Sequence, residues 1–131
     1  MTKASGTFEL KSWDEEPYEE LDDGAKLTRA SVTQAFEGAI EGDGAVQWLM
    51  AYRPDGTAHF VGLQRVRGTI EDRKGAFVLE TIGDFDGKAA NWGAQVVRGS
   101  GSGDFEGLTG TATFGAPHGS KASFDFDYEF A

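Results

Sequence analysis

FDFDYEF, residues 124–130, alternates aromatic side chains with acidic ones along its whole length. Successive side chains of a β-strand point to opposite faces of the sheet. In a strand, this period of two puts the aromatic rings on one face and the carboxylates on the other. One face covers a core and the other meets water, so the stretch predicts a half-buried antiparallel strand.

Glycine-rich turn signals divide the rest of the chain into about eight alternating segments of this kind. The signals are EGDG (41–44), PDG (54–56), DRKG (72–75), DFDG (84–87), GSGSG (99–103), EGLTG (106–110) and GAPHG (115–119). Turns so closely spaced allow hairpins, whereas parallel strands need crossovers of a dozen or more residues. The pattern predicts an all-β, single-domain, eight-stranded antiparallel meander barrel over residues 1–131, with an interior that can hold one small ligand.

Composition and charge exclude several classes of partner. The chain has 22 acidic and 12 basic residues and a net charge of −10, which disfavours nucleic acids and anionic membranes. Without cysteine, it has no disulfide, thiolate metal site or cysteine nucleophile. The chain shows neither a signal-peptide pattern nor about 20 consecutive apolar residues. We therefore expect a soluble cytoplasmic protein.

The acidic stretch 14–23 is interpreted as a solvated connection between the first two strands, with at most a single helical turn within 14–21. A cation site there is the weaker alternative, because the spacing of a calcium loop is missing. In the first strand, Phe8 and Leu10 are expected to point inward. On the fourth strand, the inner glycines Gly62 and Gly68 predict either free space or a bend.

Six segments of the chain carry a resemblance to a known family. They are TFELKSWDEEPY, LTRASVTQAFEGAIEGDGAVQWLMAY, GTAHFVGLQRVRGTI, GAFVLETIGDFDG, VVRGSGSGDFEGLTGTATF and HGSKASFDFDYEF. Together they resemble an uncharacterised bacterial domain family of unknown function whose fold is similar to that of allene oxide cyclase. The resemblance implies a barrel with a ligand cavity, in a superfamily that includes cyclases and isomerases of apolar substrates. It assigns no catalytic residue.

Inner-face residues are the candidates for a ligand wall, because small-molecule sites combine apolar area with a few polar groups. The expected wall comprises Trp48, Met50, Tyr52, Phe60, Gln64, Trp92, Phe126 and Tyr128. Tyr52 and Gln64 would orient the ligand, while Trp48 and Trp92 would stack on it. The alternative is core packing, with Gln64 hydrogen-bonded to Tyr52, Tyr128 or an internal water.

Other candidates carry weaker signals. Two isolated histidines, His59 on an outer face and His118 in a loop, supply too few ligands for a metal, so we expect neither a metal nor another cofactor. Glu80 has outward parity and is interpreted as solvated or at an interface. The segment Gly99–Gly103 lacks the helix and lysine of a phosphate loop, which favours a mobile connection, with a lid as the alternative.

Three functions remain open: a cofactor-independent cyclase or isomerase of an apolar metabolite, a non-catalytic binder of such a ligand, and a solidly packed structural or interaction barrel. Assembly is a separate expectation. Apolar residues of outward parity gather on neighbouring strands, and such a patch predicts a homo-oligomer, either a dimer or a trimer. They are Leu49, Ala51, Val61, Leu63, Val78, Ile82 and Val97.

Overall fold

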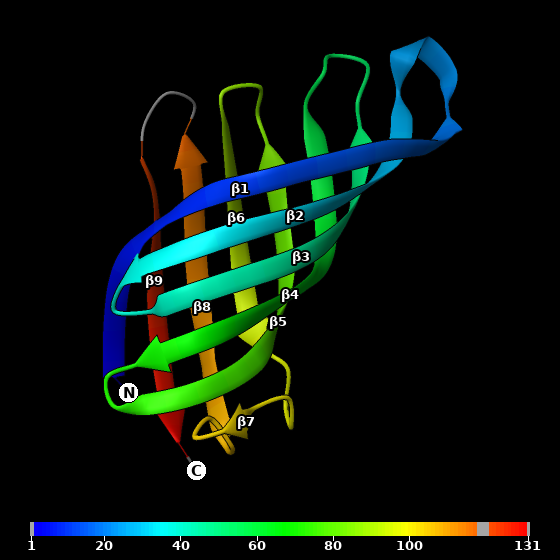
Figure 1. Ribbon diagram of the computed structural model, residues 1–131. Coiled ribbons are helices and arrows are strands. Elements are labelled where there is room, and N and C mark those ends of the chain that lie inside the picture. Colours follow the sequence, from blue (N-terminus) through cyan, green and yellow to red (C-terminus); the bar gives the residue numbers. More distant parts are fainter. Residues whose placement is uncertain (1, 118–120, 131) are drawn as a thin grey trace.

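Eight long antiparallel strands close into a barrel in the computed structural model, which describes residues 2–117 and 121–130 (Figure 1). The elements are β1 (Thr2–Glu20), η1 (Asp22–Gly24), β2 (Lys26–Gly38), β3 (Glu41–Tyr52), β4 (Ala58–Ile70), β5 (Arg73–Phe85), β6 (Ala89–Val96), β7 (Ser102–Gly103), β8 (Leu108–Pro117) and β9 (Ala122–Phe130). The order is β4-β3-β2-β1-β9-β8-β6-β5, and pairing of β4 with β5 closes it. The prediction of an all-β, eight-stranded barrel is confirmed.

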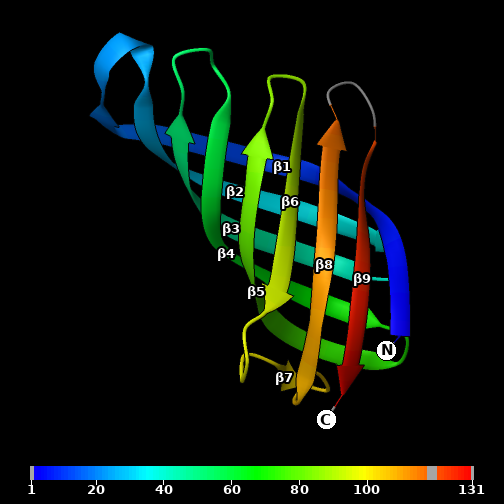
Figure 2. The same ribbon diagram turned by 180° about the vertical axis from the view of Figure 1, so that it is seen from behind.

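The barrel is flattened into two layers that share their bent strands. β2, β3 and β4 cross one side diagonally, while β6, β8 and β9 run along the other (Figures 1 and 2). β1 pairs with β9 over residues 2–8 and then continues across the barrel beside β2. Within the described residues, the β1 segment 9–20 has β2 as its only strand partner, so its other edge is free.

The barrel interior is filled by aromatic and aliphatic side chains. Phe60, Phe77, Phe124 and Phe126 are each no more than 2% exposed. An interior void lined by several of these rings measures only about 10 Å³, roughly the least that one water molecule needs. In almost every strand, the residues of inward parity are the buried ones, as predicted. Their side chains pack so closely that little empty space remains inside the barrel.

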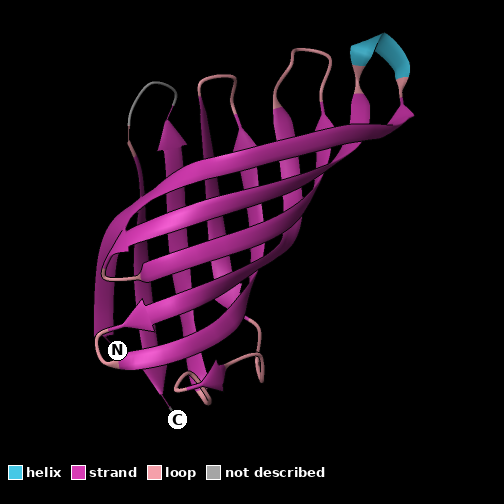
Figure 3. Ribbon diagram, viewed as in Figure 1, coloured by secondary structure: helices cyan, strands magenta, loops and turns pink. Residues whose placement is uncertain are grey.

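The acidic stretch does not form the connection that the sequence predicted. Residues 14–20 belong to β1, and the helical turn follows as η1 at Asp22–Gly24 (Figure 3). The extra residue Lys11 interrupts the register between β1 and β2, which passes from Leu10↔Gln34 to Ser12↔Thr33. At this bulge Leu10 is 42% exposed, so its predicted burial was wrong.

The glycine-rich segment 99–103 is anchored to the barrel end opposite the hairpin that joins β3 and β4 (Figure 1). Ser100 Oγ accepts a hydrogen bond from the Val78 amide at 3.1 Å, and β7 pairs with Gly75 and Ala76 of β5. The following Phe105 is 1% exposed and meets Phe77 edge to face. The segment is a connection between β6 and β8, as expected. Phe105 lies between two glycine-rich turn signals, and its burial in the core was not predicted from the sequence.

Candidate functional site

The residues expected to form a ligand wall lie inside the barrel but in two separate groups. Trp48, Phe60 and Trp92 form one aromatic cluster, with ring centroids 4.8 Å, 4.9 Å and 6.1 Å apart. Phe126 and Tyr128 stack at 5.2 Å in another group, beside Phe130 at the end of β9. Met50 is buried on β3, the strand that also carries Trp48. Tyr52 is half-buried at the end of the same strand.

A chain of hydrogen bonds crosses the first group. Gln64 Nε2 donates to Gln34 Oε1 at 2.7 Å, and Trp92 Nε1 donates to Gln64 Oε1 at 3.3 Å. Trp48 Nε1 donates to Thr81 Oγ1 at 3.0 Å. Gln64 therefore finds its partners in Gln34 and Trp92, rather than in the tyrosines considered from sequence.

Gln34 has one unsatisfied donor. It is 1% exposed, and its Nε2 has no hydrogen-bond partner among the described residues. A buried amide group without a partner costs about 1–3 kcal/mol relative to a paired one. Gln34 pairs in register with Leu10, the exposed residue beside the β1 bulge. The orphaned amide therefore lies on the part of the inner face nearest the free half of β1.

An open groove runs along the seam where β1 leaves β9. It has a volume of about 560 Å³ and is lined by Thr7, Phe8, Glu9, Leu10, Ala35, Glu37, Ala116, Pro117, Lys121 and Ala122. We call it the seam groove. Small-molecule sites commonly measure about 300–1,000 Å³. Phe8 belongs to both the groove and the core, since its ring lies 5.7 Å from Trp92 and 5.7 Å from Phe114.

A carboxylate occupies the inner side of β1 in the middle of its segment 9–20. Glu15 Oε1 accepts a hydrogen bond from Trp13 Nε1 at 2.9 Å, and Oε2 accepts one from Thr28 Oγ1 at 2.6 Å. Trp13 is 45% exposed and lies over Trp48, with 5.8 Å between ring centroids. Sequence reasoning missed Glu15 and Trp13, because the bulge at Lys11 moves the side chains that follow, as far as a second register shift after Pro17, to the opposite face.

The Tyr52 phenol is also influenced by the Glu15 carboxylate. Burial of the phenol, its hydrogen bond to Glu15 and the negative charge of Glu15 raise the pKa of Tyr52 to about 12. Each effect disfavours the phenolate. The arrangement leaves Tyr52 protonated, able to donate to Glu15 throughout the physiological pH range.

Replacing Glu15 with glutamine is expected to lower the pKa of Tyr52, while leaving it above 10 because burial is the largest cause of the shift. The measurement is phenolate absorbance against pH in a background where Tyr18 and Tyr128 are phenylalanine. At a given pH between 10 and 12, Glu15→Gln should show more phenolate than its parent. Equal curves would mean that Glu15 does not influence Tyr52.

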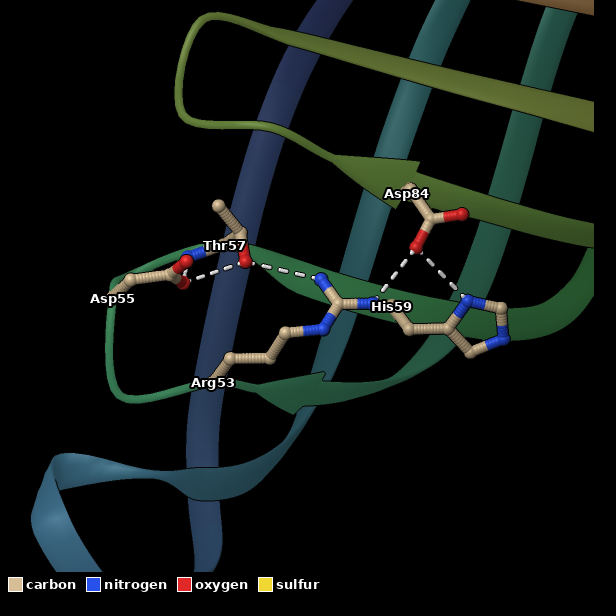
Figure 4. A network of polar contacts seen from close by, with 5 residues as sticks. All are labelled: Arg53, Asp55, Thr57, His59 and Asp84. Atoms are coloured by element: carbon tan, nitrogen blue, oxygen red, sulfur yellow. Dashed lines mark hydrogen bonds and ion pairs between the residues drawn. The ribbon is translucent and has the colours of Figure 1, made fainter.

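A second polar network lies outside the barrel, where the β3–β4 hairpin meets β5 (Figure 4). Asp84 Oδ1 is 3.1 Å from His59 Nδ1 and 3.2 Å from an Arg53 guanidinium nitrogen. Arg53 also donates to Thr57, whose hydroxyl donates to Asp55. Hydrogen bonds from His59 and Arg53 lower the pKa of Asp84. These exposed groups fasten the hairpin to the barrel wall.

The described residues contain no group of three or more potential metal-binding side chains. His59 and Glu80 face outward as expected, with His59 tied to Asp84. His118 lies outside the described residues. In the part of the chain that the structure describes, no helix is long and apolar enough to cross a membrane.

Comparison with known proteins places this barrel in a family. Residues 4–128 match the family described as "Protein of unknown function (DUF3224)". The chain belongs to the DUF3224 family. A crystal structure of a DUF3224 protein of unknown function from Shewanella oneidensis MR-1 is similar, with a TM-score of 0.85 and 28% sequence identity. The match covers 100% of this chain and 98% of that one. No curated protein matches. The DUF3224 barrel is compatible with the resemblance to allene oxide cyclase.

Proposed function

We propose that this barrel binds an apolar small molecule carrying an oxygen acceptor, which enters through the seam groove. The unpartnered Nε2 of Gln34 carries the proposal, because a ligand oxygen would satisfy a donor that the described residues leave orphaned. Leu10 links the two features, since it lines the groove and pairs in register with Gln34. A carbonyl, an epoxide or a hydroxyl oxygen would serve as the acceptor.

The architecture of β1 provides a way in. Its segment 9–20 can move from the barrel without breaking strand hydrogen bonds to β9, since its described pairing is with β2 alone. Displacement of Leu10 would bring an apolar ligand to Phe8 and then to Trp92, 5.7 Å from Phe8. Trp48, Trp92 and Gln64 then form the deep wall of the proposed site, while Met50, Phe60 and Tyr52 line its flank. Phe126 and Tyr128 lie in the other aromatic group, farther along the core.

Tryptophan fluorescence tests this proposal. Trp13→Phe removes the exposed indole, leaving Trp48 and Trp92 as reporters. The probes are a long-chain polyene and its monoepoxide, which share an apolar body and differ by one acceptor oxygen. We expect the epoxide to quench with about tenfold higher affinity, the equivalent of one net hydrogen bond.

Gln34→Glu is the matched variant, because an ionised carboxylate still accepts from Gln64 Nε2 and replaces the orphaned amide donor by an oxygen. At alkaline pH, where the carboxyl is ionised, it should lose the preference for the epoxide. Absence of quenching by either probe, or the same epoxide preference in Gln34→Glu, would contradict the proposal. Circular dichroism confirms that the variant keeps its β-structure.

A cyclase or isomerase reaction is the second candidate, favoured by Glu15 and Tyr52. A carboxylate and a protonated phenol beside Trp13 and Trp48 are groups that can accept and donate a proton. If they act on a bound ligand, Glu15→Gln abolishes product formation from the epoxide while leaving quenching unchanged. Binding without any product in the parent protein would leave the non-catalytic function alone.

A further inference from the structure

A row of exposed residues crosses the outer face of five strands at one level of the barrel. In register order it consists of Arg29 on β2, Leu49 on β3, Val61 on β4, Ile82 on β5 and Gly93 on β6. The three central side chains are 50%, 40% and 56% exposed. Three large apolar side chains on adjacent strands form a continuous patch, and patches of this kind mark interaction surfaces.

The patch extends to the next level through Leu63, which is 55% exposed. Leu63 stands between Gln47 on β3 and Glu80 on β5. Val61 and Leu63 therefore form the middle of the patch, both on β4. By contrast, Asp125, Asp127 and Glu129 give the outer face of β9 a negative charge that would repel a second copy.

The two ends of the row are complementary. Arg29 is a long cationic side chain at the β2 end, whereas Gly93 leaves the β6 end without one. A depression of about 280 Å³ lies there, and Glu80, Ile82 and Gly93 contribute to its lining. Within the described residues of one chain, Arg29 and Glu80 have no ion-pair partner.

A two-fold axis parallel to β4 would bring these features together. Rotation about an axis that passes between Val61 and its copy places Leu49 against Ile82 of the partner subunit. The same rotation places Arg29 at the depression beside Gly93 of the partner subunit, next to the partner's Glu80. Apolar surface would meet apolar surface, and each cation would meet a carboxylate at both ends, as a self-complementary interface requires.

We propose that two copies of this chain form a symmetric dimer through the outer faces of β3, β4 and β5. Val61 and Leu63 lie on the axis, and Arg29 pairs with Glu80 of the partner subunit. This dimer is independent of the proposed ligand site, because the seam groove lies where β1 leaves β9 and the dimer face lies on β3–β5.

Sedimentation velocity over a wide concentration range tests the apolar part of this interface. The wild-type chain should sediment as a dimer and Leu63→Asp as a monomer. Leu21→Asp is the matched control, since Leu21 is 45% exposed in the β1–β2 connection, outside the patch, and should leave the dimer intact. A wild-type monomer at every concentration, a trimer, or equal effects of both variants would overturn the proposal.

Charge reversal tests the two-fold arrangement itself. Arg29→Glu and Glu80→Arg should each weaken association by about tenfold or more, because each places like charges together at both ends of the interface. The double variant restores opposite charges and should recover the dimer. Both residues are exposed, so circular dichroism should show an unchanged fold. A double variant as weak as the single variants would overturn the pairing.

Discussion

Trp92→Ala is expected to lower the free energy of unfolding by about 3–5 kcal/mol, the usual cost of removing a large buried aromatic side chain. Trp92 is 4% exposed and lies at the centre of the aromatic cluster. Its ring stacks on Phe114 at 5.1 Å and meets Trp48 at 4.9 Å. Truncation also removes the donor to Gln64 Oε1, which places the loss at the upper end of this range.

Trp92→Phe separates the two contributions to this loss. Phenylalanine keeps an aromatic ring in the cluster but cannot donate to Gln64, so we expect a smaller cost of about 1–2 kcal/mol. Urea denaturation followed by circular dichroism measures both variants without relying on the indole signal. If Trp92→Ala costs no more than Trp92→Phe, the ring contacts do not stabilise the barrel as described.

The regular strands were predictable because apolar and polar residues alternate along them without interruption. In β9 the alternation of Phe124, Phe126 and Tyr128 with acidic residues continues without interruption, and the structure buries those three rings. Glycine-containing turns separate such strands, and antiparallel pairing follows from the short connections. The register then follows from the need to keep every apolar face inside.

The site was less predictable because it depends on an interruption of the same period. Counting by twos from Phe8 places Trp13 and Glu15 outside, whereas the bulge at Lys11 turns them inward. No glycine or proline marks that bulge in the sequence. Gln34 follows the inward parity of the alternating second strand, but its unpaired amide depends on the positions of Gln64 and the indole rings around it.

The filled interior also changes where ligand binding is expected. The inner glycine Gly62 was predicted to leave space or bend its strand, yet a Cβ atom there would come 2.7 Å from the Trp48 ring. The backbone of β3 and the Trp48 indole occupy the space that a side chain at position 62 would need. The proposed apolar ligand would therefore have to enter at the seam groove of about 560 Å³, because the interior void measures only about 10 Å³.

Gly62→Ala is expected to destabilise the barrel by about 2–3 kcal/mol, as overpacking in a well-filled core does. The added Cβ would lie 2.0 Å from the Gln47 carbonyl oxygen as well as 2.7 Å from Trp48. The carbonyl belongs to the backbone of β3, so a side-chain rotation cannot relieve the contact. β3 and β4 would have to separate locally, which weakens their pairing and disturbs the bond from Trp48 to Thr81.

Gly93→Ala is the matched control for this strand glycine. A Cβ at Gly93 meets no atom within 4 Å, and its backbone is not in the left-handed region. Both glycine variants are made in the Leu63→Asp parent, where the proposed dimer interface that includes Gly93 is absent. Alanine at position 93 should then leave stability unchanged or raise it by up to about 1 kcal/mol, because it restricts the unfolded chain. The urea midpoint of each variant is compared with that of the parent at one protein concentration. The midpoint should fall for Gly62→Ala, and it should rise or stay unchanged for Gly93→Ala. A Gly62→Ala midpoint equal to that of Gly93→Ala would show that β3 and β4 can separate at this position without loss, and that their close approach does not hold the Trp48 ring in place.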